Sequence, residues 1–274
     1  MQIERTKIIG FCSGVRRAIK MAEQERNAYI AGGEIIHNPQ ETTRLKKEFN
    51  INPSKISDIP HGSTAIIRAH GIGEAEQKSM KDKNIKIIDA TCPHVKRVQN
   101  LAREFTANGY NVFLFGEKGH AEVHGICGHA NTELTVFSSV AELESIILPE
   151  HVALISQTTK PTEEFCKAEE LLSKKVKYFK SVCTICNATQ ENQKAAAELA
   201  KLSDIMIVIG GKSSSNTKAL VTAATPFCND IYQVESAADL RQSWFIGKKR
   251  CGIAAGLSTP DYSIDEVEAA IGLL

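Results

Sequence analysis

Short apolar runs rich in β-branched residues alternate along the chain with stretches of helical periodicity. This alternation is typical of parallel βαβ units and predicts an α/β fold. The expected strands lie at 33–36, 64–67, 111–116, 151–155, 205–210 and 251–254.

Three cysteines share one local setting, because each follows a short apolar run and opens a helical pattern. They are Cys12, Cys92 and Cys186, spaced about 90 residues apart. A repeat of this length is too long for a solenoid. We therefore expect three small, diverged α/β domains around a common centre, with boundaries at 13–91, 92–181 and 182–274. Residues 1–12 are expected to pack on the third domain.

Polar residues follow the predicted strands of each repeat. Ligands of open parallel sheets gather at the carboxyl ends of the strands, so these turns are the candidate site. Their polar residues are His37, His70, His120, Thr158, Ser214 and Ser258.

Composition narrows the class of protein. The 274 residues are 42% hydrophobic and 24% charged, with a formal net charge of +1, which gives no reason to expect nucleic acid or a membrane surface as partner. No apolar run approaches the roughly 20 residues of a membrane span, and the start lacks a signal-like apolar region. We expect a cytoplasmic protein whose eight cysteines are thiols or metal ligands.

The recurrence of Cys12, Cys92 and Cys186 favours three ligands of one iron–sulfur cluster, since thiolates are the usual cluster ligands and a helix N-terminus favours the thiolate. The repeat alone leaves buried structural thiols as an open alternative. Cys183 forms a C-x-x-C pair with Cys186, which could indicate a redox pair or half a zinc site. We interpret Cys183 as an incidental neighbour. Core or surface thiols are expected at Cys166, Cys228 and Cys251.

The segment 119–129 carries a second constellation. His120, His124 and Cys127 have a spacing within reach of zinc chemistry, but the segment is expected to be a glycine-rich turn rather than a helix. In an extended segment, His120 and Glu122 would lie on the same side. Glu122 beside a low-dielectric cluster would have a raised pKa and could deliver a proton; a solvated loop carboxylate is the alternative.

The stretch 210–217 follows a predicted strand and precedes a predicted helix. Its small hydroxyl residues and backbone amides suit an anion, although the P-loop pattern is absent. Together with the histidine turns, it predicts a pocket for a phosphorylated group.

At this point the chain resembles, over essentially its whole length, the 4-hydroxy-3-methylbut-2-enyl diphosphate reductase family of isoprenoid biosynthesis. The resemblance rests on ordered motifs at 10–15, 37–40, 69–71, 89–93, 119–123, 157–159, 184–189, 214–216 and 258–260.

The resemblance implies three α/β domains in a trefoil around a central 4Fe–4S cluster with one open iron, held by Cys12, Cys92 and Cys186. Glu122 matches the proton donor and Thr158 its hydroxyl-bearing partner, while His120 serves both catalysis and binding. The substrate-binding positions matched are His37, His70, His120, Thr158, Ser214, Ser215, Asn216 and Ser258.

The implied reaction is reductive dehydroxylation of the allylic diphosphate to isopentenyl and dimethylallyl diphosphate, with two electrons and two protons. A ferredoxin or flavodoxin would donate the electrons. Two departures stand out: Cys183 precedes the third cysteine motif, and Ala121 stands where the family often has proline.

Two other classes of protein fit the sequence less well. Quinolinate synthase also has three units with one cysteine each, but its dicarboxylate calls for arginine or lysine in the turns, where this chain has histidine, serine and asparagine. A cluster-based redox sensor needs an output surface such as a basic DNA-binding helix, and the near-zero net charge offers none.

Overall fold

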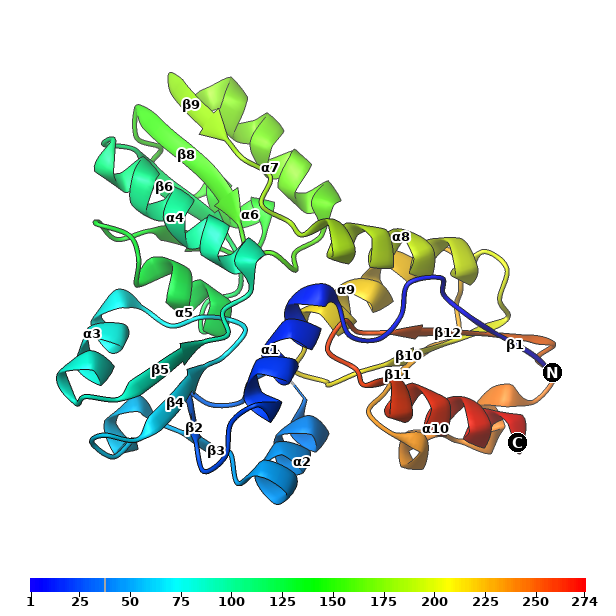
Figure 1. Ribbon diagram of the computed structural model, residues 1–274. Helices are drawn as coiled ribbons and strands as arrows, with labels where there is room; N and C mark the ends of the chain where they lie inside the picture. Colours follow the sequence, from blue (N-terminus) through cyan, green and yellow to red (C-terminus); the bar gives the residue numbers. More distant parts are fainter. Residues whose placement is uncertain (37) are drawn as a thin grey trace. The chain divides into compact units, whose positions relative to one another are not determined.

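The computed structural model describes residues 1–36 and 38–274, and its strands form three four-stranded parallel sheets (Figure 1). The described chain divides into two compact units. Unit 1 comprises residues 1–16, 37–41 and 187–274, and unit 2 comprises residues 17–36 and 42–186. The predicted α/β class is confirmed. The domain boundaries at 13–91, 92–181 and 182–274 stay a prediction.

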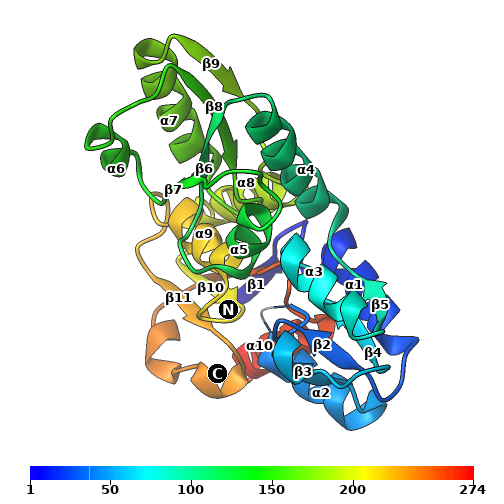
Figure 2. The ribbon, with the colours of Figure 1, turned by 90° about the vertical axis from the view of Figure 1, so that its left-hand side faces the viewer.

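One sheet of unit 2 has apolar side chains on both faces. Phe113 and Phe115 pack with α7, and Val112 and Leu114 pack with α4. The turned view in Figure 2 shows these helices on either side of the sheet. Because side chains alternate along a strand, a sheet covered on both faces requires the continuous apolar runs seen in the sequence. The elements, in sheet order β7-β6-β8-β9, are β6 (Asn111–Phe115), β7 (Thr135–Phe137), β8 (His151–Ser156), β9 (Tyr178–Ser181), α4 (Pro93–Ala107), α5 (Ala121–Cys127), α6 (Val140–Glu144) and α7 (Thr162–Lys175).

The other sheet of unit 2 has the order β3-β2-β4-β5. Ala65 and Ile67 pack against Ile72 and against Met80 of α3. This region consists of β2 (Tyr29–Ala31), β3 (Asn52–Ser54), η1 (Ile56–Asp58), β4 (Thr64–Ile67), α3 (Glu74–Asp82) and β5 (Lys86–Asp89). The helices α1 (Ser13–Glu23) and α2 (Pro39–Phe49) lie in sequence before it and within it.

The sheet of unit 1 has the order β1-β12-β10-β11. Ile207 of this sheet packs with Ile264 of α10 on one face, and Val208 packs with Leu199 of α8 on the other; Figure 1 shows α8 and α10 on opposite sides. The elements are β1 (Gln2–Arg5), α8 (Asn187–Ala200), β10 (Ile205–Ile209), α9 (Ser215–Ala224), β11 (Ile231–Val234), η2 (Ala237–Asp239), η3 (Gln242–Phe245), β12 (Arg250–Ala255) and α10 (Asp261–Gly272).

A backbone hydrogen bond recurs at the carboxyl end of each sheet. The first residue after one central strand is a glycine, and its N–H donates to the last residue of the neighbouring edge strand. The three bonds are Gly32 to Ser54 (3.1 Å), Gly116 to Phe137 (2.8 Å) and Gly210 to Val234 (2.9 Å). The repeat predicted from the cysteines is therefore also present in the backbone of the strand ends.

One predicted strand is wrong. The expected strand at 33–36 is a bend, and the strand β2 ends at Ala31. Gly32 and Gly33 have φ values of +84° and +115°, which end the extended conformation. Ile35 and Ile36 are nevertheless fully buried, so their apolar character reports burial rather than a strand. The other five predicted strands are confirmed within one residue at each end.

Within the described ranges, no helix is long and apolar enough to cross a membrane.

Candidate functional site

The three repeated cysteines occupy equivalent places in the backbone. Helices α1, α4 and α8 begin at the residue directly after Cys12, Cys92 and Cys186, respectively, which confirms the predicted helix starts. Each cysteine N–H donates to a carbonyl two residues beyond a central strand. These bonds are Cys12 to Leu257 (3.2 Å), Cys92 to Ala69 (2.9 Å) and Cys186 to Thr158 (2.9 Å).

These cysteines have the chemistry that a cluster needs. All three are partly exposed thiols at helix starts, and cysteine sulfurs are the usual ligands of iron–sulfur clusters. The Val15 N–H also points at Cys12 Sγ, at 3.5 Å. Cys12 belongs to unit 1, whereas Cys92 and Cys186 belong to unit 2.

Among residues 1–36 and 38–274, no three His, Cys, Asp or Glu side chains gather as ligands of a single metal ion. The zinc site considered for His120, His124 and Cys127 is therefore not formed among these residues. Three thiolates on a four-iron cluster each bind a different iron, so they need not lie as close together as the ligands of one ion.

Cys183 differs from its neighbour Cys186. The residue as a whole is exposed, but its sulfur is partly buried. This burial raises the pKa of the thiol, and a hydrogen bond from the Ile185 N–H opposes the rise. A raised pKa disfavours the thiolate, in keeping with its interpretation as an incidental neighbour.

Glu122 and Thr158 form a buried acid–hydroxyl pair in unit 2. Glu122 is 2% exposed. Its Oε1 accepts a hydrogen bond from the Thr158 N–H (2.6 Å), and its Oε2 accepts one from the Thr158 hydroxyl (2.9 Å). Burial raises the pKa of Glu122 to about 7, against the lowering effect of both Thr158 hydrogen bonds. The carboxyl group can therefore carry a proton near neutral pH.

The expected extended segment around His120 is wrong. Residues 121–127 form helix α5, and His120 is its N-cap, with Nδ1 accepting the Glu122 N–H at 3.1 Å. The cap satisfies an amide that would otherwise lack a partner. His124 lies one helical turn on, is exposed, and pairs with Glu76 at 3.3 Å. It thus lies away from the Glu122–Thr158 pair.

His70 and His120 come together in unit 2. Their ring centroids lie 5.6 Å apart in an edge-to-face arrangement. Two glycines allow this approach: Gly125 lies against the His70 carbonyl, and Gly71 has a φ of +74° with Gln99 filling the place of a side chain. The structure thus brings together four predicted residues of unit 2: His70, His120, Glu122 and Thr158.

The predicted polar turn of unit 1 is also formed. Ser214 caps α9 and accepts the Thr217 N–H at 3.3 Å. Ser215 and Asn216 occupy the first turn and are 5% and 6% exposed. Neither Oδ1 nor Nδ2 of the buried Asn216 has a hydrogen-bond partner among the described residues. An orphaned amide beside a helix N-terminus is suited to a bound anion.

Sequence reasoning gave Asn38 no role, although it lies in a noted motif. Its Nδ2 donates to the Ser258 carbonyl at 3.1 Å, and its Oδ1 accepts the Glu41 N–H at 3.0 Å. Asn38 therefore fixes the turn that carries Ser258. An asparagine directly before Pro39 and a helix was the available signal. His37 lies outside the described residues.

Comparison with known proteins covers the whole chain. Residues 3–272 match the family model described as LytB protein. The chain is 44% identical to the 4-hydroxy-3-methylbut-2-enyl diphosphate reductases of Campylobacter hominis and Helicobacter pylori strain Shi470, and it covers 100% of both chains in each pair.

Solved structures of similar proteins agree. One is that of (E)-4-hydroxy-3-methyl-but-2-enyl diphosphate reductase, the terminal enzyme of the non-mevalonate pathway, with 38% identity, a TM-score of 0.72 and full coverage of both chains. Another is the reductase of Plasmodium falciparum, with 27% identity and a TM-score of 0.91, covering 100% of this chain and 87% of that one. The chain belongs to the LytB family of 4-hydroxy-3-methylbut-2-enyl diphosphate reductases.

Proposed function

We propose that this protein is an oxidoreductase that removes the hydroxyl group of 4-hydroxy-3-methylbut-2-enyl diphosphate, with two electrons and two protons, to give isopentenyl and dimethylallyl diphosphate. The observation that carries the proposal is the end-to-end similarity to named reductases at 44% identity. The buried acid at Glu122, whose pKa is raised to about 7, supports a reaction that consumes protons.

Cys12, Cys92 and Cys186 are the residues that would hold the cofactor. Their equivalent positions at helix starts support ligation by one thiolate from each repeat. A 4Fe–4S cluster held there would supply electrons one at a time and one iron with an open coordination position.

The diphosphate is assigned to the polar turns of both units. The buried, unpartnered amide of Asn216 and the N-terminus of α9 support an anion-binding role in unit 1. The neighbouring rings of His70 and His120 support one in unit 2. The full proposed set is His37, His70, His120, Thr158, Ser214, Ser215, Asn216 and Ser258.

Glu122 is assigned as the proton donor, with Thr158 as its partner and His120 contributing to catalysis. Burial raises the pKa of Glu122 to about 7, so the carboxyl group can hold a proton near neutral pH. The Thr158 hydroxyl, 2.9 Å from Oε2, orients the carboxyl and can pass a proton onward. The His120 cap fixes the backbone that carries Glu122.

The electrons are assigned to an external carrier, a ferredoxin or flavodoxin, and the reaction to the cytoplasm. Anaerobic purification with iron and sulfide analysis tests the cofactor, with about four of each expected per chain. Dithionite-driven turnover of the allylic diphosphate tests the reaction. Full iron loading with no conversion would contradict the proposed substrate, and absence of iron after cluster reconstitution would contradict the proposed cofactor.

A further inference from the structure

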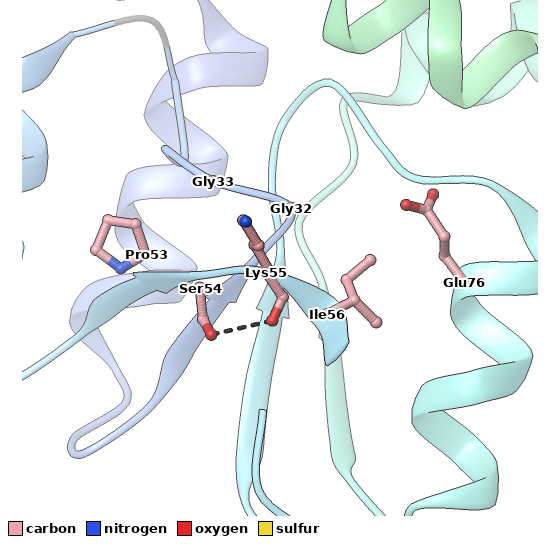
Figure 3. Close-up of a pocket in the computed structure, with 7 residues that line it drawn as sticks. All are labelled: Gly32, Gly33, Pro53, Ser54, Lys55, Ile56 and Glu76. Carbon is pink, nitrogen blue, oxygen red and sulfur yellow. Dashed lines mark hydrogen bonds between the residues drawn. The ribbon is translucent and has the colours of Figure 1, made fainter. Parts of the chain in front are cut away.

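A cavity lies in unit 2, at the carboxyl ends of β2 and β3. Its volume is about 390 Å³, which is within the range of small-molecule sites. Figure 3 shows Lys55 extending over the cavity toward the Gly32–Gly33 turn and Glu76 facing it from α3. The full lining is Gly32, Gly33, Pro53, Ser54, Lys55, Ile56 and Glu76.

Arg68 borders the same glycine turn. A Cβ placed on Gly32 would lie 3.4 Å from Arg68 Nε and Nη2, and one on Gly33 would lie 3.6 Å from Nη1. The guanidinium therefore runs along the turn, in space that side chains at 32 and 33 would take. Both glycines have positive φ, a conformation that glycine adopts without strain, and both line the cavity.

The repeat shows what is unusual about Arg68. Arg68 is the first residue after β4, and Gln157 is the first residue after the equivalent strand β8. Gln157 Oε1 accepts the N–H of Glu117, at 3.0 Å, and so closes the turn after β6. Gly33 is the equivalent of Glu117, but an arginine cannot accept its N–H. At this end of the sheet, the Gly33 N–H and the Arg68 guanidinium are both donors. In the other repeat, the equivalent groups are a donor, the Glu117 N–H, and an acceptor, Gln157 Oε1.

The charge of Arg68 is only partly compensated. Burial lowers the pKa of its guanidinium, and the nearby charge of Glu76 only partly opposes this. Nε is buried without an acceptor among the described residues. The Glu76 carboxylate is already engaged by the Gly73 N–H at 2.7 Å and by His124 at 3.3 Å. A partly buried cation without a bonded carboxylate is costly, and an anionic ligand would remove that cost.

We propose that a phosphate group, either as orthophosphate or as a phosphomonoester, binds at the Gly32–Gly33 edge of this cavity, where Lys55 lines the cavity and Arg68 lies beside the glycine turn. Two cations match a phosphate dianion better than they match a ligand with a single carboxylate, and the arginine fork is suited to phosphate oxygens. The Gly32 N–H already donates to Ser54, so the Gly33 N–H is the backbone donor offered to the phosphate. None of the residues of this site belongs to the proposed diphosphate-binding set, and the inference does not depend on the proposed function. The site lies at the start of the loop that leads from Arg68 to His70, so its occupancy is expected to stabilise that loop.

Crystals of the full chain soaked in selenate would locate the oxyanion by the anomalous signal of selenium. We expect selenate within hydrogen-bond distance of Arg68, whether or not a second ion lies near Asn216. Selenate near Asn216 with none at Arg68 would overturn the proposal.

Titration of the cluster-loaded protein with inorganic phosphate measures the same site in solution. Arg68→Gln should weaken one class of phosphate site at least about tenfold, because a charge-assisted pair is lost. Arg68→Lys, which keeps the charge but loses the fork, should weaken it less. The matched control is Lys78→Gln, an exposed cation of α3 outside this cavity, which should change nothing.

If Arg68→Gln does not fold, Lys55→Gln at the exposed rim provides the second test and should also weaken phosphate. Unchanged phosphate affinity in the folded variants would overturn the proposal, as would equally tight binding of acetate or succinate. Glycerol 3-phosphate distinguishes the two sources: tighter binding than orthophosphate assigns the cavity to a phosphomonoester, and weaker binding assigns it to the free ion.

Discussion

The polar turns of the two units differ in how their side chains are satisfied. In unit 2, both oxygens of Glu122 accept hydrogen bonds from Thr158. In unit 1, the Asn216 amide is also buried, yet neither of its polar atoms has a partner among the described residues. Buried polar groups are normally paired, so the unpaired amide is suited to binding a ligand, whereas both oxygens of the acid already have partners.

This difference suggests that the two turns have different roles, proton transfer in unit 2 and ligand binding in unit 1. A carboxyl group that is positioned in advance and has a raised pKa is suited to proton transfer. Polar groups that form hydrogen bonds only when a ligand is present are suited to binding that ligand. We therefore expect substitutions at Glu122 to act on kcat and substitutions around Asn216 to act on KM.

The largest predicted effect is loss of the cluster, and it should be the same for cysteine substitutions in either unit. Cys12→Ser in unit 1 and Cys92→Ser or Cys186→Ser in unit 2 should each remove most of the cluster and the activity, because each repeat supplies one of three thiolates. Iron and sulfide content and the visible charge-transfer absorption, measured anaerobically, report the loss.

Cys183→Ser is the matched control, since it lies three residues from Cys186 and is exposed. It should retain full iron loading. Loss of iron in Cys183→Ser with normal loading in Cys186→Ser would reverse the assignment of the pair.

Glu122→Gln should have the next largest effect. Glutamine keeps the size of the side chain but cannot deliver a carboxylic proton, and the loss of general acid catalysis costs about 10²–10⁴ in rate. We expect kcat to fall at least about a hundredfold with a normal cluster spectrum and little change in KM. Rates with a chemical reductant exclude effects on carrier docking.

His124→Gln serves as the control for Glu122→Gln. His124 is on the same helix, but its side chain is 62% exposed and pairs with Glu76. It should turn over nearly normally. Near-normal turnover of Glu122→Gln would instead remove Glu122 from the mechanism.

Asn216→Leu should act on binding. Leucine is similar in size but offers no hydrogen bond to the ligand, so KM should rise about tenfold or more while kcat changes less. Ser214→Ala should act in the same direction through the loss of the α9 cap. Ser213→Ala, the exposed neighbour in the same turn, is the control. A fall in kcat at constant KM for Asn216→Leu would break the proposed division between the units.

The sequence pattern was sufficient for most of the fold. Strands such as β10 are apolar at every position because both faces are covered, by α10 and α8, so their runs are easy to find. The pattern failed at 33–36, where Ile35 and Ile36 are buried in a bend. Burial selects apolar residues in bends as it does in strands, and the glycines at 32 and 33 were the better guide.

The candidate site was predicted by residue but not by local conformation. The helix α5 was missed because its seven residues contain a glycine and begin without a usual N-cap residue. His120 caps it through its ring nitrogen, which sequence propensities do not anticipate. The cavity beside the Gly32–Gly33 turn was also missed. The unusual setting of Arg68 appears only when Arg68 is compared with Gln157, which follows the equivalent strand of another repeat.

The smallest predicted effect is the pH dependence of turnover. The pKa of Glu122 is raised from its ordinary value of 4.5 to about 7, so the protonated acid predominates below pH 7 and is lost as the pH rises through 7. If the protonated form is the donor, kcat should fall about tenfold from pH 6 to pH 8, and it should not fall on acidification toward pH 6. Reduced methyl viologen is a suitable electron source because its potential does not change with pH. The residual rate of Glu122→Gln should lack this fall, since glutamine does not titrate. A wild-type rate that is flat or rises across this range would mean that the proton comes from another group, and the acid of unit 2 would then be a structural pair with Thr158.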